Sequence, residues 1–273
     1  MKLPFRAVLA PLLGLTFLAR AAFAQQASGE ESAAELAKEL ANPLASLISV
    51  PLKVNWDTGY GPADADRTTW LVQPVVPFEL NKDWNLITRT IVPLHIRAQS
   101  PVAGGRTETG FGDVTQSFFF SPKAAAAGGW IWGAGPVLLY PTASNDRLGG
   151  EKWGAGPSLV GLKQADGWTY GALANHIWSF AGTDSRSDLS VTFIQPFLAY
   201  STPKARTYSV NTEASYDWKG EQWTVPINFG VSQVMRFGRL PVSLGFTARV
   251  YAERPSGGPD WGLSVQATFL FPK

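Results

Sequence analysis

The sequence offers few side chains that could carry out catalysis near neutral pH. Its two histidines are His95 and His176, and histidine is the side chain whose ordinary pKa suits a base at that pH. Ser179 follows His176 by three positions, so on a strand their side chains point to opposite faces. Ser100 is separated from His95 by the expected end of a strand. Nucleophilic catalysis needs a base beside the nucleophile. The sequence therefore predicts a protein that is not an enzyme, with a membrane lipid hydrolase as a remote alternative.

Metal and cofactor sites are not indicated either. The chain has no cysteine, and two separated histidines with scattered acids lack the spacing of metal ligands. The pentapeptide WGAGP occurs twice, at residues 132–136 and 153–157. It lacks the Lys-Ser/Thr pair and the following helix that a phosphate-binding loop needs. We expect neither a metal nor a cofactor.

The first 24 residues have the pattern of a secretory signal peptide. Lys2 and Arg6 precede an apolar run over residues 7–19, and residues 22–24 (AFA) form a small-x-small cleavage site. The run is shorter than the ~20 residues that cross a bilayer as a helix, which argues against an uncleaved anchor. The segment holds three of the 23 basic residues and none of the 21 acids. The mature chain is therefore left with no basic excess for nucleic acid.

Residues 25–46 predict a short helical segment. Ser28 and Glu31 have capping-box spacing, Leu36 and Leu40 lie about one turn apart, and Pro43 ends the run. This weakly amphipathic helix either enters the mouth of a barrel as a plug or remains a loose periplasmic element. We expect contact with the lumen or the mouth.

From residue 47 onward the hydrophobic pattern repeats every two residues, which indicates strands with one apolar and one polar face. In residues 222–232, for example, Trp223, Val225 and Ile227 alternate with Thr224 and Asn228. Twelve such runs cover residues 47–57, 68–78, 84–97, 110–120, 130–140, 152–162, 167–179, 189–200, 206–218, 222–232, 240–252 and 260–271. The alternation is irregular in 110–120, and 189–200 fits either phase.

Three features favour a membrane barrel over a soluble sandwich for residues 47–273. The runs are about 11 residues long, enough to cross a membrane when tilted, whereas sandwich strands are commonly about five or six residues. Long and short connections alternate along most of the chain, as in outer-membrane barrels. Tryptophan gathers near the expected strand ends, where indole can form interfacial girdles. The girdle candidates are Trp56, Trp70, Trp84, Trp130, Trp153, Trp168, Trp178, Trp218, Trp223 and Trp261.

The predicted fold is therefore all-β: a single transmembrane antiparallel β-barrel of about 12 strands with a short N-terminal helix. Prolines inside the expected strands conflict with a regular ladder, because proline has no N–H to donate. They include Pro51, Pro74, Pro136, Pro157, Pro196 and Pro226. We expect bulges or strand starts at several of these positions.

Several phrases of the sequence resemble a known family. They include GFGDVTQSFFFSP at 110–122, LANHIWSFAG at 173–182, EQWTVPINFGVSQV at 221–234 and WGLSVQATFLFPK at 261–273. Together they are similar to a bacterial outer-membrane transporter family that is grouped with phenol-degradation meta-pathway proteins and often misnamed "neuromedin U". The resemblance runs from about residue 42 to the C-terminus. It implies a Gram-negative outer-membrane barrel with a transport role, possible hydrophobic or aromatic solutes, and no established binding residues.

Inward polar side chains are the candidates for a transport path. They carry both charge signs, so they either set the selectivity of an open lumen or pair with one another and close it. These candidates are Lys53, Asn55, Arg89, His95, Arg97, Asp113, Asn175, Glu213, Asn228, Arg249 and Gln266. We expect a passive channel for small molecules, with a non-conducting structural or adhesive barrel as the alternative. Its expected partners are outer-membrane lipid and lipopolysaccharide, the barrel-assembly machinery through the C-terminal strand, and a small solute.

The WGAGP copies gain a place in such a barrel. Trp132 and Trp153 begin successive strands that run in opposite directions, so they should lie in opposite interfacial belts. By alternation the four glycines of the two copies face the lumen, with Ala134 and Ala155 toward lipid. These glycines are Gly133, Gly135, Gly154 and Gly156. We expect either the N-terminal helix or an open pore to occupy the space beside them.

Overall fold

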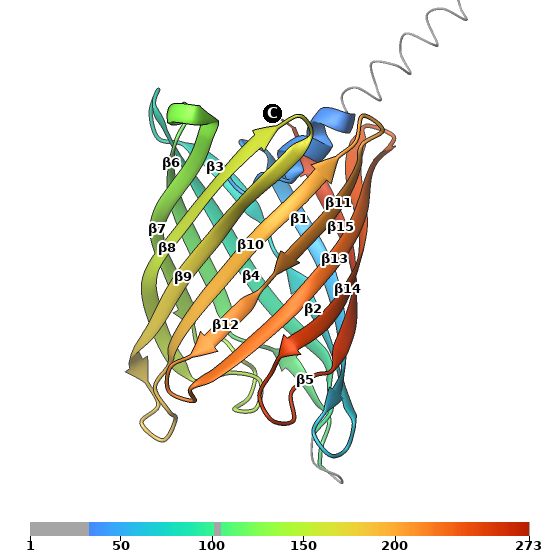
Figure 1. Cartoon of the computed structure of the whole chain (residues 1–273). Helices are drawn as coiled ribbons and strands as arrows, with labels where there is room; N and C mark the ends of the chain where they lie inside the picture. The colour runs from blue at the N-terminus through green and yellow to red at the C-terminus, as the bar shows by residue number, and fades with distance from the viewer. Residues whose placement is uncertain (1–32, 101–104, 273) are drawn as a thin grey trace, which may run out of the picture.

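The computed structural model describes residues 33–100 and 105–272, and these form a closed β-barrel with a short helix inside one end (Figure 1). The predicted signal peptide, Ser28 and Glu31 lie outside the described residues. The helix covers residues 33–40. The strands are β1 (Ile48–Tyr60), β2 (Ala65–Val72), β3 (Val75–Glu79), β4 (Trp84–Ala98), β5 (Glu108–Phe111), β6 (Val114–Pro122), β7 (Trp130–Tyr140), β8 (Lys152–Ala165), β9 (Trp168–Gly182), β10 (Ser190–Ser201), β11 (Arg206–Thr212), β12 (Ala214–Asp217), β13 (Gln222–Phe237), β14 (Leu240–Glu253) and β15 (Trp261–Phe271).

The fifteen segments make twelve membrane-crossing strands. β2 with β3, β5 with β6, and β11 with β12 are each one strand with a local interruption, because both members pair with the same neighbouring strand. Every pairing is antiparallel, and β1 closes the barrel on β15, from Ile48 opposite Phe271 to Thr58 opposite Trp261. The structure confirms the predicted all-β barrel of twelve strands with a short N-terminal helix.

The two ends of the barrel differ. The helix and the C-terminus lie at the same end (Figure 1), which we call the terminal end. Tight connections such as residues 166–167 and 238–239 lie there, although β6 and β7 are joined through a single 3-10 turn, Ala127–Gly129. The opposite end, which we call the loop end, carries longer connections such as residues 141–151 and 254–260.

Prolines explain two of the interruptions. Pro74 stands in the gap between β2 and β3. Glu213 separates β11 from β12, and the neighbouring strands carry Pro196 and Pro226 beside this gap. Neither proline has an N–H to offer the ladder, so the strand at Glu213 is free to bend. The pairing of β13 with β14 also shifts its register between Val225 and Pro226.

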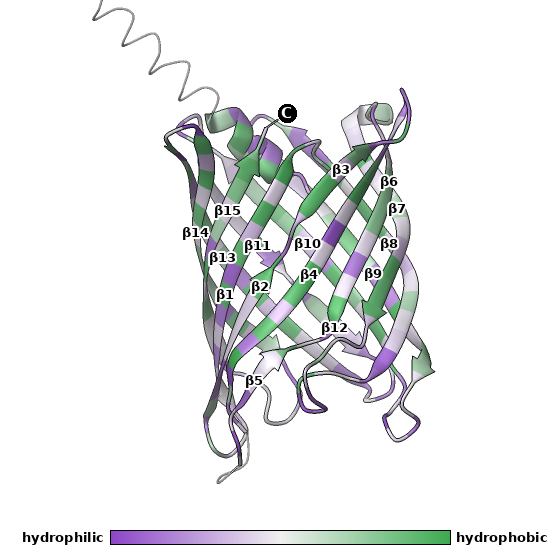
Figure 2. Cartoon of the chain, turned by 180° about the vertical axis from the view of Figure 1, so that it is seen from behind, coloured by the Kyte–Doolittle hydropathy of each residue, from purple (hydrophilic) through white to green (hydrophobic). Residues whose placement is uncertain are grey.

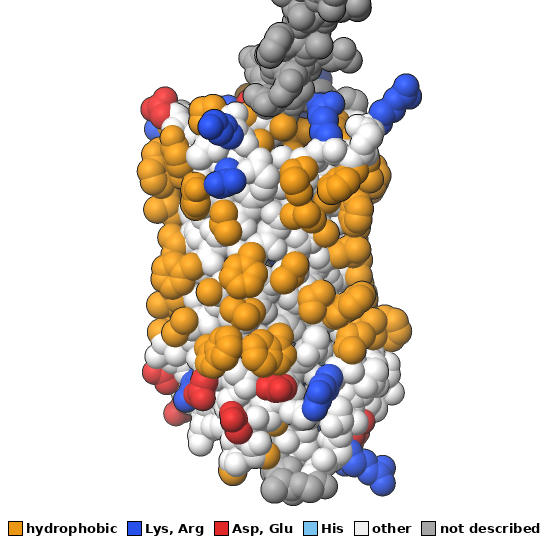
Figure 3. All heavy atoms as spheres, turned by 90° about the vertical axis from the view of Figure 1, so that its right-hand side faces the viewer, with side chains coloured by type: hydrophobic (Ala, Val, Ile, Leu, Met, Phe, Trp, Pro, Cys, Tyr) orange, Lys and Arg blue, Asp and Glu red, His pale blue; other side chains and the backbone are white. Residues whose placement is uncertain are grey.

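The outside of the barrel is apolar over its middle and charged at both ends (Figure 3). Leu159, Phe229 and Val265 are each more than half exposed there, and hydropathy alternates along the strands (Figure 2). A soluble protein buries such side chains, so this surface fits a hydrocarbon environment. Among the described residues, no helix has both the length and the apolar character needed to cross a membrane.

Aromatic side chains gather toward both ends of this apolar band. Ring contacts join Trp84 to Trp132 and Trp168 to Tyr200 near the terminal end, and Trp56 to Trp261 near the loop end. Trp153 packs on Tyr140 near the loop end, so the tryptophans of the two WGAGP copies lie in opposite belts. These pairs place indole rings where a girdle requires them.

Candidate functional site in the barrel lumen

The N-terminal helix packs against the inner surface of the terminal end. Its apolar face carries Ala33, Leu36 and Ala37, which form a buried cluster with Val234 and Leu270 of the wall. Two further residues, Leu47 and Ala205, belong to this cluster. Burial of the apolar stripe holds the helix inside the mouth.

After the helix, the chain crosses to the opposite side of the lumen. Leu44 is only 5% exposed and belongs to a second buried cluster, which lies on β4, β6, β8 and β9. Its other buried members are Ile87, Phe119, Val160, Leu162 and Leu173. The amides of Asn85 and Gln164 donate to Ser46 Oγ (3.3 Å) and to the Lys38 carbonyl (2.8 Å). Residues 33–47 therefore contact both sides of the lumen and narrow it.

Two cavities flank this crossing segment. The larger, of about 330 Å³, lies between residues 37–43 and the wall of β10, β11, β13 and β14; the smaller, of about 180 Å³, reaches toward Glu39. Both are lined by Leu40, Pro43, Gln73, Arg89 and Gln266. Burial, followed by the nearby charge of Glu35, raises the pKa of the Glu39 carboxyl. The space left beside the segment is thus lined by apolar residues of the segment and polar residues of the wall.

A charged layer lies in the wall around these cavities. Lys53 Nζ is 3.6 Å from Glu213 Oε1, and the two side chains are 13% and 27% exposed. Arg89 Nη2 donates to Gln73 Oε1 over a long 3.4 Å. Bending of the strand at Glu213 therefore brings a carboxylate opposite Lys53 across the lumen, while Arg89 contacts a neutral amide.

A second charged layer lies nearer the loop end. Arg249 Nη1 is 3.3 Å from Asp57, and the hydroxyl of Tyr251 donates to Asp57 Oδ1 (3.0 Å) while it accepts from Arg249 Nη2 (3.0 Å). Arg67 stacks over the ring of Tyr60 at 4.8 Å. Ser264 donates to Asn55 Oδ1 (2.6 Å) in the same wall. Most of these groups bind each other, so this layer is a fixed network.

The structure brings some of the lumen candidates together and separates others. Lys53, Arg89, Glu213, Asn228 and Gln266 line the larger cavity. Asn55 and Arg249 belong to the layer nearer the loop end, and Asn175 lies on the inward face of β9 beside the buried Leu173. His95 Nδ1 is 2.9 Å from Thr69 Oγ1 in the wall.

Two candidates lie away from the path. Arg97 is exposed at the end of β4, where a bulge between Thr68 and Thr69 disturbs the alternation. Asp113 accepts hydrogen bonds from the N–H groups of Ala143 (3.1 Å) and Gly150 (2.7 Å), so it holds the 141–151 loop in place. Neither residue lines the two cavities.

The four glycines of the WGAGP copies have different neighbours. A Cβ on Gly133 would meet Leu44 and Phe119, and one on Gly154 would meet Ile177 and Leu139. A Cβ on Gly135 or Gly156 would fall on the backbone carbonyl of Phe118 or His176. The expected occupant, the N-terminal helix or an open pore, is replaced by Leu44 just beyond the helix at Gly133, and by wall atoms at the other three glycines.

Prolines account for this close approach. Pro136 lies opposite Pro157 in the β7–β8 register, and the ladders to β6 and β9 are interrupted beside them. Without a proline N–H, the neighbouring carbonyls of Phe118 and His176 face the glycine Cα groups, an arrangement that fits weak Cα–H···O contacts. WGAGP is thus a strand kink that excludes a side chain.

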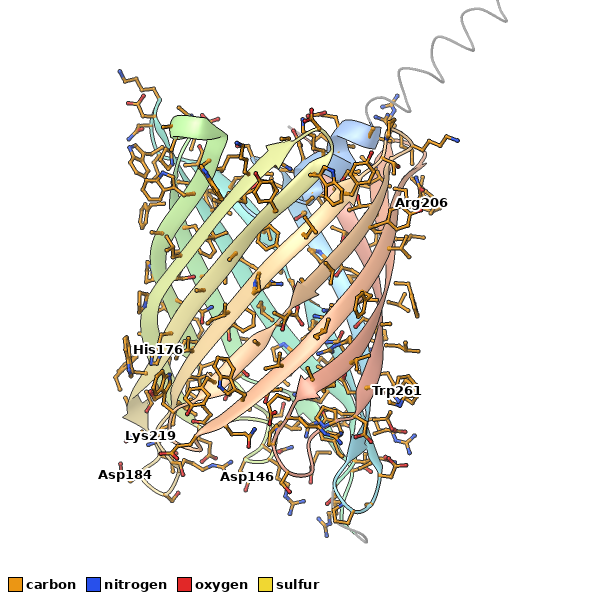
Figure 4. The ribbon with its side chains drawn as sticks, in the orientation of Figure 1. Asp146, His176, Asp184, Arg206, Lys219 and Trp261 are labelled. Atoms are coloured by element: carbon orange, nitrogen blue, oxygen red, sulfur yellow. The ribbon has the colours of Figure 1, made fainter. Side chains whose placement is uncertain are left out.

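His176 has partners that the sequence spacing did not reveal. Its Nδ1 is 2.7 Å from Thr192 Oγ1, its Nε2 is 3.4 Å from Ser190 Oγ, and its ring packs on Trp178. It lies near the loop end (Figure 4), where these hydrogen bonds hold its ring in place. The base and a hydroxyl are adjacent, but no carboxylate bonds the imidazole among the described residues. Thr192 Oγ1 also accepts a hydrogen bond from Trp218 Nε1 (2.8 Å).

Trp70 departs from the girdle pattern. It is 50% exposed and pairs with Val54, at the middle of β1. The sequence placed Trp70 near a strand end because the run was expected to begin at residue 68, whereas β2 begins at Ala65. Trp132, which was not among the girdle candidates, is 37% exposed and contacts Trp84.

Other lining residues went unnoticed in the sequence. Asp57 and Tyr251 continue the inward alternation of Asn55 and Arg249, so the period alone could have found them. Arg67 shares the inward face of β2 with Thr69, and Gln73, directly after β2, lies beside Arg89. Leu44 had no such signal, because it contacts the wall from outside any strand. No group of three or more His, Cys, Asp or Glu that could hold a metal ion occurs within residues 33–100 and 105–272.

Comparison with solved structures shows a shared fold. A crystal structure of an outer-membrane channel from Pseudomonas putida F1 matches with a TM-score of 0.64, over 83% of this chain and 96% of that chain, at 13% sequence identity. Outer membrane phospholipase A from Escherichia coli matches with a TM-score of 0.48, over 81% of this chain and 92% of that chain, at 10% identity. No protein-family model and no curated protein matches the sequence.

Proposed function

We propose that the chain is an outer-membrane channel through which small molecules pass passively along the lumen beside residues 33–47. The observation that carries this function is the pair of cavities beside the crossing segment, which are lined by charged and polar wall residues. A barrel with a purely structural role gains nothing from a buried polar space, because such groups are costly to bury. The fold shared with a bacterial outer-membrane channel supports the same assignment.

The surroundings of the barrel follow from this assignment. The apolar exterior contacts membrane lipid, with lipopolysaccharide at the loop end, and the terminal end faces the periplasm because short turns and both chain ends belong there in such barrels. The alternation of β15, which ends with Phe269 and Phe271, supports recognition by the barrel-assembly machinery. Extraction by detergent and no release on osmotic shock are the expected fractionation results; release on shock would contradict the membrane assignment.

The solute class is the finer part of the proposal. The sequence resemblance to the transporter family grouped with phenol-degradation proteins supports hydrophobic or aromatic solutes. The apolar cavity residues Leu40, Pro43, Leu173 and Phe197 also support it. A solute of this kind would pack its apolar surface against residues 33–47, and its opposite surface would face the polar residues of the barrel wall.

Solute entry into proteoliposomes tests the proposal. Reconstituted protein should admit small sugars, amino acids and aromatic solutes, and deletion of residues 33–46 should speed entry, because the segment narrows the lumen. Planar-bilayer conductance should rise with the same deletion. If neither protein admits solute or carries current, the barrel is non-conducting, and a structural or adhesive role in which the loop end binds a partner takes its place.

A further inference from the structure

Of the two described cations that line the larger cavity, Lys53 pairs with Glu213, whereas Arg89 has no carboxylate partner. Arg67, nearer the loop end, also has none among the described residues and stacks on Tyr60. The one side-chain hydrogen bond of Arg89 is the 3.4 Å contact with Gln73, and no carboxylate lies within 4.0 Å of it among the described residues. A guanidinium has five N–H donors, and burying a cation without an anion is costly. Arg89 lines both cavities, so its remaining donors face the space that a solute would occupy.

The neighbouring carboxylates form ion pairs with other cations, although the charge of Glu213 also acts on Arg89. Glu213 forms its ion pair with Lys53, and Asp57 forms its pair with Arg249. Counted with Arg67, the two charged layers hold four cations and two carboxylates, a net charge of +2. Glu39 also lines the smaller cavity; its carboxyl is partly desolvated although the residue is exposed at the terminal end, and counting it lowers the excess to +1. A narrow lumen with a cationic excess attracts anions and raises their local concentration.

The lining of the larger cavity also includes apolar side chains. Leu40 and Pro43 of the crossing segment, with Leu173 and Phe197 of the wall, line it together with the polar residues. The volume of about 330 Å³ falls in the range of pockets for small organic ligands. The cavity therefore combines one available cation with an apolar surface.

Building on the proposed channel function, we infer that the lumen holds a binding site for amphipathic organic anions. The anionic group, a carboxylate or its like, accepts hydrogen bonds from the guanidinium of Arg89, and the apolar body packs on Leu40, Pro43 and Phe197. Arg89 suits this role because its planar fork can bind both oxygens of a carboxylate. A neutral molecule of the same shape would cover the apolar surface but would leave the Arg89 guanidinium without an anion, so it should bind less tightly.

Equilibrium dialysis of the full-length protein in detergent, with a protein-free micelle blank, tests the site. The probes are benzoate and benzamide, which share a ring and differ in charge. Benzoate should bind about tenfold more tightly than benzamide, because hydrogen bonds to charged groups are the stronger ones. Raising the salt concentration should weaken benzoate binding alone.

Three variants separate the charge of Arg89 from charge in general. Arg89→Gln should abolish the preference for benzoate, whereas Arg239→Gln in the turn between β13 and β14 changes the same charge outside the lumen and should preserve it. Gln266→Glu provides a near-isosteric test if Arg89→Gln does not fold. It places a carboxylate among the residues that line both cavities with Arg89, and it should abolish the preference as well.

Binding and flux give distinguishable outcomes. Equal binding of both probes, or a preference that survives both Arg89→Gln and Gln266→Glu, overturns the anion site even if the protein conducts. A benzoate preference that these variants remove, in a protein that admits no solute, supports the site and sinks the channel function. If the protein binds benzoate in preference to benzamide, and benzoate also enters liposomes faster than benzamide, both the anion site and the channel function are supported.

Discussion

The wall formed by β6–β9 and the wall formed by β13–β15 with β1 differ in the larger side chains at their inward positions, which are mainly apolar in the first and include charged and amide groups in the second. The first, which we call the apolar wall, presents Phe119, Val137, Val160, Leu162 and Leu173, all nearly or fully buried. The second, the polar wall, presents a different set, again largely buried: Asn55, Asp57, Asn228, Ser243, Arg249, Ser264 and Thr268. Both walls face the same lumen, so the difference lies in what covers them.

Residues 33–47 explain the difference. Leu44 covers the apolar wall, and the kinks at Gly135 and Gly156 draw the strands together there. The polar wall is left beside the larger cavity, and part of its hydrogen-bonding capacity is met by side-chain hydrogen bonds such as that from Asn228 Nδ2 to Asn211 Oδ1 (2.9 Å). One barrel thus has a dry side that anchors the segment and a wet side, beside the larger cavity, that borders the proposed solute path.

Removing one partner of the most buried ion pair in the polar wall should lower the stability of the barrel more than any other change considered below. Asp57→Asn leaves Arg249 without its anion, and the loss of one partner of a buried pair costs about 4 kcal/mol. Urea unfolding followed by tryptophan fluorescence measures the loss.

The double variant Asp57→Asn/Arg249→Gln is the control for this ion pair. It should recover much of the lost stability, because it removes the unpaired charge. Additive losses in the double variant would mean that the two side chains do not act as a pair.

A substitution in the apolar wall tests the kink. Gly156→Ala places a methyl group on the His176 carbonyl and should lower stability by about 3 kcal/mol, as severe overpacking does. Gly161→Ala in the same strand meets nothing within 4 Å and is the matched control. The temperature at which the folded band is lost on gel electrophoresis compares them. If the Gly156→Ala and Gly161→Ala variants lost the folded band at the same temperature, the close approach of the His176 carbonyl to Gly156 would be contradicted.

Weakening the anchoring of residues 33–47 should open space beside the apolar wall. Leu44→Ala removes a 5% exposed side chain from the apolar cluster and should weaken anchoring of the segment by about 2 kcal/mol. Bilayer conductance should rise, and protease should cut residues 41–47 faster. Leu80→Ala, at a position that is 49% exposed, should change neither. Unchanged conductance with faster cutting would show that the segment does not restrict the lumen.

The two walls also explain how far the sequence could be interpreted. The polar wall gives clean alternation in residues 47–57, 222–232, 240–252 and 260–271, because one face meets lipid and the other meets water or polar partners. In the apolar wall the outward face is apolar and the inward face mixes large apolar residues such as Phe119 and Val160 with small polar ones such as Ser117 and Ser158, so the contrast between faces is weak. Residues 110–120 lose their phase there, and the structure places Phe119 inward and the 42% exposed Phe120 outward. Strand number and fold were therefore predictable, while the filling of the lumen was not.

Individual contacts of the site depended on long-range register. No local pattern connects Leu44 to Gly133, or Glu213 to Lys53, because these contacts depend on how the segment enters and on where prolines bend the strands. The partners of His176 lie across a hairpin whose loop length hid their register. Periodicity assigns a residue to a face; the depth of the residue and its partners come from closure of the barrel.

The smallest effect is expected at the loop end of the apolar wall. Lys152 Nζ, on a side chain that is 7% exposed, donates to Asp188 Oδ1 (3.1 Å), and Ser179 Oγ donates to the same carboxylate (3.2 Å). These hydrogen bonds, that from Lys152 first, hold the pKa of the Asp188 carboxyl below its ordinary value of 3.8. A lowered pKa in the folded state stabilises the loop above that ordinary value, and this contribution is lost as the pH falls through the folded value.

Amide exchange of Leu189, whose N–H bonds Ser179 Oγ at 2.9 Å, reports on this contact. After correction for intrinsic exchange, protection should be constant above about pH 5 and should decline below the ordinary carboxyl pKa. Asp188→Asn should lack this acid-dependent step, whereas Asp184→Asn in the same loop should retain it. Because Asp188 is well exposed, the loss should stay within the 183–189 loop and leave the unfolding midpoint of the barrel unchanged. Protection that declines equally in Asp188→Asn would assign the acid step to another group.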